Sequence, residues 1–423
     1  MNQRGWLRLI SVLVVAVGAV ILARPVAHWF ETPRPLSKLL QLVHEAKREP
    51  SQQNLAEREL RLYLSHHPDS REANMMMANL LIDRNNPKPE EALAHLDRLR
   101  SRDLKTRAAV LVARGKAHYI LSRFRQSEAE WKEAMSLDPE VPEAGWLLIQ
   151  QYYIQGRNDL CRELAIRLAS VESDPVDRVR YMLELVREEV ERLAPAGIIP
   201  WLEPAVKLDP DDWDSMVALG RAQVKEGQST AGFALLKRAV ERRPDDLRGW
   251  DYLLGGLSDE GSLEELERQL SRLPAALAND SRLAIHRGRL AQERQQFDEA
   301  VKWYRVSLEA YPNDQRLLHR LARVLHLASR PTEARPYEER EAALAVAARE
   351  LKAHYEKVKS AKTAPVARDF QTFAAIRERQ GLREEALGWH RLVLRDDPEN
   401  VESRLALARL ERGNALSASQ PES

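Results

Sequence analysis

The sequence predicts an all-α protein, a solenoid of short helical hairpins preceded by a single transmembrane helix. Composition is the first observation: 423 residues contain only 17 glycines and 22 prolines, and Ala, Leu, Arg and Glu are abundant. These abundant residue types favour helix over strand. The second observation is a proline-containing turn that recurs at steps of 34 to 36 residues from Pro139 to Pro244, and the third is an uncharged apolar stretch near the N-terminus.

The predicted membrane anchor and a proline-rich linker occupy residues 1–35. Residues 9–23 carry no charge, and Trp6 and Trp29 flank them where interfacial aromatics are expected. With these flanks the stretch is long enough for a bilayer, which requires about 20 residues. We favour an uncleaved signal anchor because no small-x-small cleavage site follows. A cleaved signal peptide and a buried helix of a soluble protein stay open as alternatives.

The orientation of this anchor is less sharply indicated. Arg4 and Arg8 precede the span, while Arg24, Arg34 and Lys38 follow it, so the positive-inside rule gives no clean answer. A first helix with a short basic head favours a cytoplasmic amino end. We therefore expect a single-pass membrane protein with its repeats on the extracytoplasmic side.

A solenoid array is predicted over residues 36–330, and its clearest hairpin covers residues 213–246. Small residues at Gly220, Gly232 and Ala239 fall on the inner faces of two amphipathic helices, where helices approach closely. Pro244 ends the second helix. The same closing turn recurs at Pro68, Pro139, Pro175, Pro210, Pro244, Pro312 and Pro398. From Pro139 to Pro244 the steps are 36, 35 and 34 residues.

These units resemble the tetratricopeptide repeat family, which has a period of about 34 residues. The best-matching residues are Gly115, Trp131, Ala134 and Pro139, then Gly220, Ala239 and Pro244, then Gly288, Ala300, Tyr304 and Pro312. The resemblance implies a right-handed superhelix whose first helices line a concave face. It departs from the pattern most at residues 181–210, where several prolines predict an irregular hairpin. Such a resemblance is specific for architecture and weak for function.

Beyond the array, residues 331–365 predict a long inserted helix, centred on 337–362. Its expected apolar stripe is Ala342, Val346, Leu351, Tyr355 and Val358. Covering the end of the stack is the favoured role, and a partner-binding or dimerising helix is the alternative. Residues 366–412 predict a last repeat and a capping helix, and 413–423 a disordered tail.

The sequence lacks the common motifs of phosphate-binding and zinc-dependent enzymes. It contains no GxxxxGK[ST] phosphate loop and no HExxH, and Cys161 is its only cysteine. The 65 basic and 64 acidic residues leave a net charge of +1, so no global field favours nucleic acid. We therefore expect a protein that is not an enzyme and has no cofactor, no metal site and no nucleic-acid partner.

A basic wall is the candidate binding site. Equivalent positions of successive hairpins form ladders along the concave face of a repeat array. By the family resemblance, the wall consists of Arg221, Lys225, Arg248, Arg282, Arg289, Arg316 and Arg323. Arginine forks bind carboxylates in pairs, so this wall suits an acidic or carboxy-terminal peptide. Asp251 and Glu293 lie close enough in sequence to neutralise part of it, and a merely solvated charged face is the alternative.

The resulting functional hypothesis is a non-catalytic, membrane-anchored scaffold that binds a protein or peptide in its concave groove. The alternative is an accessory subunit that presents substrate to a separate catalytic partner. Self-association through the long helix or the anchor is a further possibility that the sequence leaves open.

Overall fold

The computed structural model describes residues 33–139, 141–191 and 194–417, and within these ranges every regular element is a helix. The chain divides into two compact units, one ending at Asp138 and the other beginning at Pro139. This division falls inside the predicted array 36–330, at one of its proline turns. Each unit is described by itself.

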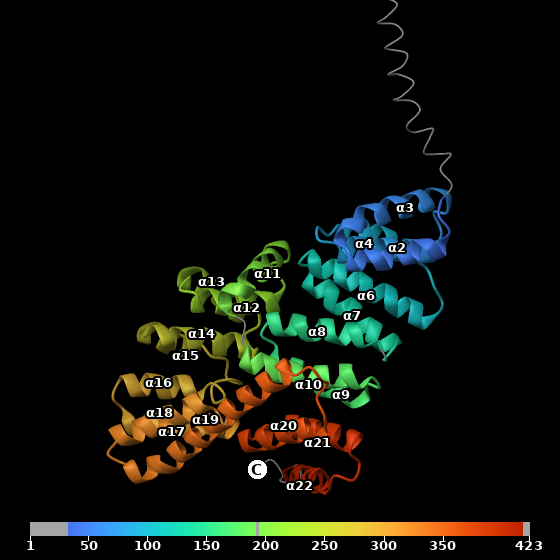
Figure 1. Cartoon of the computed structure of the whole chain (residues 1–423). Coiled ribbons are helices and arrows are strands. Elements are labelled where there is room, and N and C mark those ends of the chain that lie inside the picture. The colour runs from blue at the N-terminus through green and yellow to red at the C-terminus, as the bar shows by residue number, and fades with distance from the viewer. Residues whose placement is uncertain (1–32, 140, 192–193, 418–423) are drawn as a thin grey trace, which may run out of the picture. The chain divides into compact units, whose positions relative to one another are not determined.

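The first unit is built of short consecutive helices, coloured blue to green in Figure 1. They are α2 (Leu36–Arg48), the 3-10 turn η1 (Pro50–Gln52), α3 (Gln53–His66), α4 (Arg71–Asp83), α5 (Pro89–Leu96), α6 (Leu104–Ile120) and α7 (Phe124–Leu137). Trp131 of α7 is fully buried against α6, where its indole Nε1 donates to the Val112 carbonyl at 3.2 Å. A methyl group at Gly115 would lie 2.2 Å from that nitrogen, so the glycine makes room for the ring.

The second unit contains the remaining helices. They are α8 (Pro142–Ile154), α9 (Asn158–Val171), α10 (Pro175–Val190), α11 (Pro195–Leu208), α12 (Trp213–Lys225), α13 (Ser229–Arg242), α14 (Leu247–Glu260), α15 (Leu263–Ser271), α16 (Ala284–Glu293), α17 (Phe297–Ala310), α18 (Gln315–Leu327), α19 (Pro331–Ser360), α20 (Ala367–Gln380), α21 (Arg383–Asp396) and α22 (Val401–Ser417). Neighbours in sequence pack as hairpins, as the repeat pattern predicts.

The recurring turn works through two residues, a proline that ends one helix and an aspartate that caps the next. α13 ends two residues before Pro244, and Asp246 then accepts a hydrogen bond from the backbone N–H of Arg248 at 3.0 Å. Asp314, two residues after Pro312, likewise accepts from two backbone N–H groups at the start of α18. A side chain that satisfies these donors stabilises a helix start by about 1 kcal/mol.

Small residues set the distance between the two helices of the central hairpin. A methyl group at Gly232 of α13 would lie 2.7 Å from the carbonyl oxygen of Gly220 in α12. Ala239, further along α13, is fully buried. Because only short side chains fit at such a crossing, the structure confirms the packing role predicted for these positions.

Two elements differ in detail from the expected pattern. α11 is a helix of 14 residues despite Pro200 and Pro204 inside it. These prolines are four residues apart, so the N–H missing at Pro204 is the one that would have reached the Pro200 carbonyl. α19 runs for 30 residues and begins at Pro331. Its buried stripe is Leu344, Ala347, Leu351, Tyr355 and Val358, so the expected Ala342 and Val346 lie on an exposed side.

The membrane prediction requires correction. The predicted span, residues 9–23, lies outside the described residues. In the part of the chain that the structure describes, no helix has both the length and the apolar character needed to cross a bilayer. The prediction of a single-pass membrane protein with extracytoplasmic repeats is contradicted by this finding.

Candidate partner-binding site

The helical array of the second unit folds back on itself. α19 and α21 pack against α10, and α21 also packs against α9, although these helices are far apart in sequence (Figure 1). At the crossing of α21 and α10, a methyl group at Gly388 would lie 2.8 Å from the Met182 methyl. The Arg395 guanidinium donates to the carbonyl oxygens of Ser170 and Glu172, at 2.8 and 3.0 Å, where α9 ends. The end of the array therefore closes on its earlier repeats.

A buried ion network joins the helices at this closure. The Arg377 side chain on α20 is only 1% exposed and that of Glu385 on α21 only 4%, and their Nε and Oε2 atoms are 2.9 Å apart. This contact is an ion pair without hydrogen-bond alignment, since neither atom has a hydrogen-bond partner among the described residues. Arg377 also donates to Glu189 of α10 at 2.5 Å, and Arg162 of α9 donates to Glu385 at 2.8 Å. Charges buried this deeply require such mutual pairing.

A half-open cavity of about 630 Å³ lies at the closure, and we call it the closure cavity. Its apolar lining comes from Ile154, Leu185, Ile198, Ala218 and Leu382, with the rings of Tyr153 and Tyr252 beside them. Its charged lining consists of Arg162, Glu189, Arg221, Lys225, Arg316 and Glu385. Cavities of this size that combine an apolar lining with a few polar groups are typical of ligand sites.

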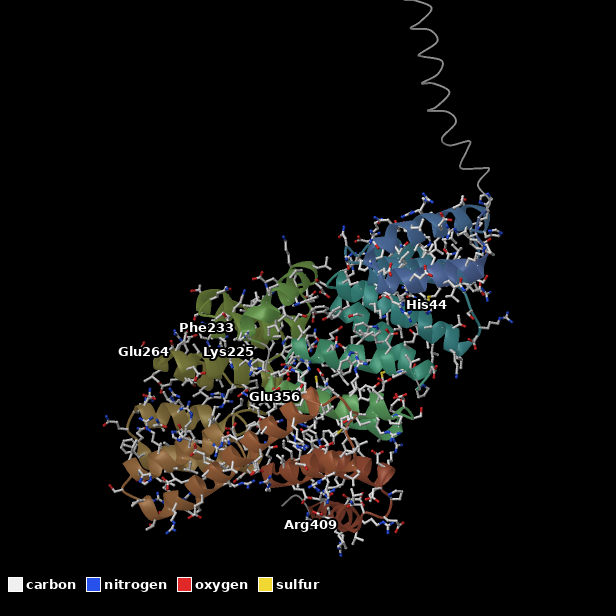
Figure 2. All side chains as sticks on the ribbon, in the orientation of Figure 1. His44, Lys225, Phe233, Glu264, Glu356 and Arg409 are labelled. Atoms are coloured by element: carbon white, nitrogen blue, oxygen red, sulfur yellow. The ribbon has the colours of Figure 1, made fainter. Side chains whose placement is uncertain are left out.

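Three of the seven predicted cations reach the closure cavity. Arg221 is held in place by Tyr252: its guanidinium lies 4.3 Å from the centre of the ring and donates to the hydroxyl at 3.1 Å. Lys225 is exposed at the C-terminal end of α12 and is labelled in Figure 2. Arg316 comes from α18, and the five helices α13 to α17 lie between it and α12 in the chain. Both carboxylates of the cavity pair with Arg162 or Arg377. Arg221, Lys225 and Arg316 add three further positive charges to its lining.

Arg248 and Arg282 are neutralised by acids of their own neighbourhood. Arg248 pairs with Asp214 and lies over the Trp213 ring. Arg282 forms a two-pronged ion pair with Asp280, with contacts of 2.9 and 2.6 Å. The hydrogen bonds that the Arg282 guanidinium donates to Asp280 raise its pKa. Neither arginine lines the closure cavity.

The last two predicted cations, Arg289 and Arg323, line a second cavity of about 780 Å³ between α16 and α18, together with Arg316. We call it the α18 groove. Arg289 pairs with Glu293 at 3.1 Å, as the sequence led us to consider. Asp251, the other acid considered, pairs instead with His286 at 3.0 Å. Five of the seven predicted cations therefore line two cavities, and Arg316 lines both of them.

Sequence reasoning missed the residues that close the site. Tyr252 lies 31 residues after Arg221, close to one repeat, so a search for aromatics at the repeat spacing could have found it. Arg162 and Glu189 had no local signal, because their partners Glu385 and Arg377 are 223 and 188 residues distant.

Two other kinds of site, a metal centre and a reactive thiol, were considered for the described residues. No group of three or more His, Cys, Asp or Glu side chains among them could hold a metal ion. Cys161 is buried in α9, and its thiol donates to the Ile149 carbonyl at 3.3 Å. The thiol therefore behaves as a small core residue.

Comparison with known proteins supports the architecture. No protein-family model matches the chain. The peroxisomal targeting signal receptor of Komagataella phaffii is 22% identical over 228 residues, which is 52% of this chain and 38% of that receptor. The receptor of the same name from Kluyveromyces lactis is 24% identical over 173 residues, 39% of this chain and 30% of its own length. The chain thus spans well under half the length of the curated relatives it matches.

Three solved structures resemble this chain at low sequence identity and low TM-score. The Cut9–Hcn1 hetero-tetramer of APC/C is 15% identical with a TM-score of 0.34, covering 97% of this chain and 96% of that one. Pseudomonas aeruginosa PilF is 18% identical with a TM-score of 0.31, covering 60% and 99%. A MamA D159K mutant is 22% identical with a TM-score of 0.28, covering 39% and 97%. The helical hairpins of the chain itself, rather than these distant similarities, make its fold a tetratricopeptide-like helical repeat.

Proposed function

We propose that this chain is a non-catalytic repeat scaffold that holds an acidic or carboxy-terminal segment of a protein partner in the closure cavity. The observation that carries the proposal is the meeting of Arg221 and Lys225 of α12 with Arg316 of α18 at one half-open cavity that has both polar and apolar lining. Cations at the rim can pair with carboxylates, while the tyrosines and aliphatic side chains accept an apolar side chain. The name of the curated relatives, a targeting signal receptor, supports a role in peptide recognition.

Selection from a random peptide library tests this proposal, because the library presents acidic, basic and apolar side chains in many combinations. The library is displayed with free carboxyl ends and selected on the full chain. Enriched peptides are expected to combine an apolar residue with Asp, Glu or the terminal carboxylate. The same selection on Lys225→Glu should lose them, because an anion would then replace a cation at the rim. Binding of the enriched peptides should also weaken with salt, since exposed charge pairs are screened over about 8 Å at physiological ionic strength.

Arg282→Glu is the matched control. Arg282 is an exposed arginine of the same predicted wall, but it lines neither cavity and already pairs with Asp280. We expect this variant to select the same peptides as the wild type, with circular dichroism confirming that both variants stay folded. If Lys225→Glu also selects the same peptides, or if the wild type enriches none, the closure cavity is not a carboxylate-binding site.

A further inference from the structure

One face of α18 is basic over its whole length. Arg316, Arg320, Arg323 and Leu327 follow at intervals of three and four residues and all line the α18 groove, and His319 lies on the same side. The opposite face, including Leu317, Leu321 and Leu325, is buried. The basic side chains therefore occupy the face that α18 turns away from its own core.

The acids of this groove are engaged, while two of its arginines are not. Glu293 pairs with Arg289, and Glu341 of α19 lies 3.2 Å from His319. Arg316 and Arg323 are both exposed, and neither guanidinium has a hydrogen-bond or ion-pair partner anywhere in the described part of the chain. Arg248 and Arg282 are already paired with acids of this chain, whereas the guanidinium groups of Arg316 and Arg323 can bind an external carboxylate through two hydrogen bonds.

Arg316 belongs to both cavities, so the two are adjacent. We propose that the closure cavity and the α18 groove form one elongated site for an extended acidic segment of the partner. The segment has its apolar part in the closure cavity and continues along α18 with carboxylates on Arg316 and Arg323. This inference rests on the proposed function and extends it, because it specifies the chemistry of the chain next to the anchored residue.

Helix geometry gives the spacing of the two carboxylates. Arg316 and Arg323 are seven residues apart, or about 10 Å along the helix axis at 1.5 Å per residue. A polyproline II segment rises about 3.1 Å per residue with three residues per turn, so side chains three apart share a side and lie about 9 Å apart. The expected recognition pattern is therefore a pair of Asp or Glu residues three positions apart, next to an apolar residue.

The same peptide selection, carried out on Arg323→Glu, tests this inference. Arg323 lines only the α18 groove, so its reversal should remove the acidic pair from the enriched peptides while leaving the apolar residue in place. For one peptide enriched on the wild type, fluorescence anisotropy should show binding at least about tenfold weaker on Arg323→Glu. Replacing the peptide carboxylate nearest Arg323 by Lys should weaken binding to the wild type and restore it on the variant. Such a rescue separates direct pairing from an indirect structural effect.

Arg335→Glu is the control, because Arg335 is an exposed arginine of α19 that lines neither cavity. It should select the wild-type peptides. If enrichment depends on Lys225 but is unchanged on Arg323→Glu, the α18 groove is only a solvated basic face, and the inference is overturned while the proposed function stands. If the wild type enriches no peptide, both fail together.

Discussion

At the scale of single residues, buried charge is retained only where several opposite charges surround it. Glu57 in the first unit receives hydrogen bonds from Lys88 at 2.7 Å, Arg61 at 2.8 Å and Arg84 at 2.5 Å. Burial by itself would raise the pKa of this carboxyl group. The hydrogen bonds from Lys88, Arg61 and Arg84 outweigh burial and lower the pKa of Glu57 to about 2.

A pKa below the ordinary value of 4.5 makes Glu57 a source of acid sensitivity. Its contribution to stability is complete above about pH 4.5 and is lost as the pH falls toward 2, because protonation then disrupts the cluster. The contribution is at most about 3 kcal/mol, from 1.36 kcal/mol per pKa unit, and solvent reduces it since Arg61 and Lys88 are partly exposed. Glu57→Gln should therefore be less stable than the wild type at pH 7.

Urea unfolding at a series of pH values measures this difference. The gap in unfolding free energy between wild type and Glu57→Gln should narrow from pH 4.5 to pH 2.5. Glu72→Gln, at an exposed acid of the same unit, should show a small gap at every pH. A gap for Glu57→Gln that does not change with pH would mean that the cluster does not hold the ionised carboxylate.

At the scale of elements, the closure depends on the ion network between α10, α20 and α21. Arg377→Met removes the most deeply buried cation and leaves Glu385 with Arg162 alone. Removing one partner of a buried ion pair typically costs about 3 kcal/mol or more, since the remaining charge stays desolvated. We expect a loss of that order in the unfolding free energy, measured by denaturant titration.

An exposed pair supplies the comparison. Arg335 and Glu339 of α19 form an ion pair whose side chains are 80% and 66% exposed. Arg335→Met should change stability by no more than about 0.5 kcal/mol. Changing Glu385 to Leu in the Arg377→Met background should recover part of the loss, because the desolvated carboxylate is then removed as well. Equal effects of Arg377→Met and Arg335→Met would show that the network contributes nothing to the closure.

At the scale of the whole molecule, the closure should couple helices that are distant in sequence. Gly388→Val places side-chain atoms where Met182 of α10 already lies, so α21 cannot pack as before. Hydrogen exchange should therefore become faster in α9 and α10 as well as in α20 to α22. Helices α2 to α7 belong to the other compact unit and should exchange at their original rates.

Gly197→Val controls for valine itself, because nothing lies within 4 Å of a methyl group placed at Gly197. This variant should change exchange only within α11. If Gly388→Val alters exchange only inside α21, the contact between α21 and α10 does not couple the two ends of the array.

Much of the fold could be predicted because its signals are local. The turns around Pro244 and Pro312, the small residues Gly220 and Gly232, and the size of the repeat all act within about 34 residues. The sequence also predicted the long helix, but its buried stripe differs from the predicted one, because packing against α18, α20 and α10 decides which side of α19 is covered. That choice cannot be read from the helix's own residues.

The candidate site was less accessible to sequence reasoning, for the same physical reason. Ladder counting identified seven cations but could not tell which would be neutralised. Pairing depends on side-chain reach: Asp280 lies two residues from Arg282, whereas Arg316 and Arg323 meet no acid among the described residues. Comparing equivalent positions of the repeats therefore placed Arg316 and Arg323 on one face of α18. It also counted Arg248 and Arg282 as part of the wall, although acids neutralise both.

An all-helical repeat fold follows from the sequence, since periodic apolar faces, proline ends and aspartate caps act between residues close along the chain. The place where the array closes, and which charges stay unpaired among the described residues, depend on contacts between distant segments. The Arg377–Glu385–Arg162 network and the Gly388–Met182 contact join segments about 200 residues apart, and no local pattern specifies which of many apolar and charged faces will meet. Contacts between neighbouring hairpins recur in every repeat and leave a periodic pattern in the sequence, whereas the contacts of the closure occur once and leave none.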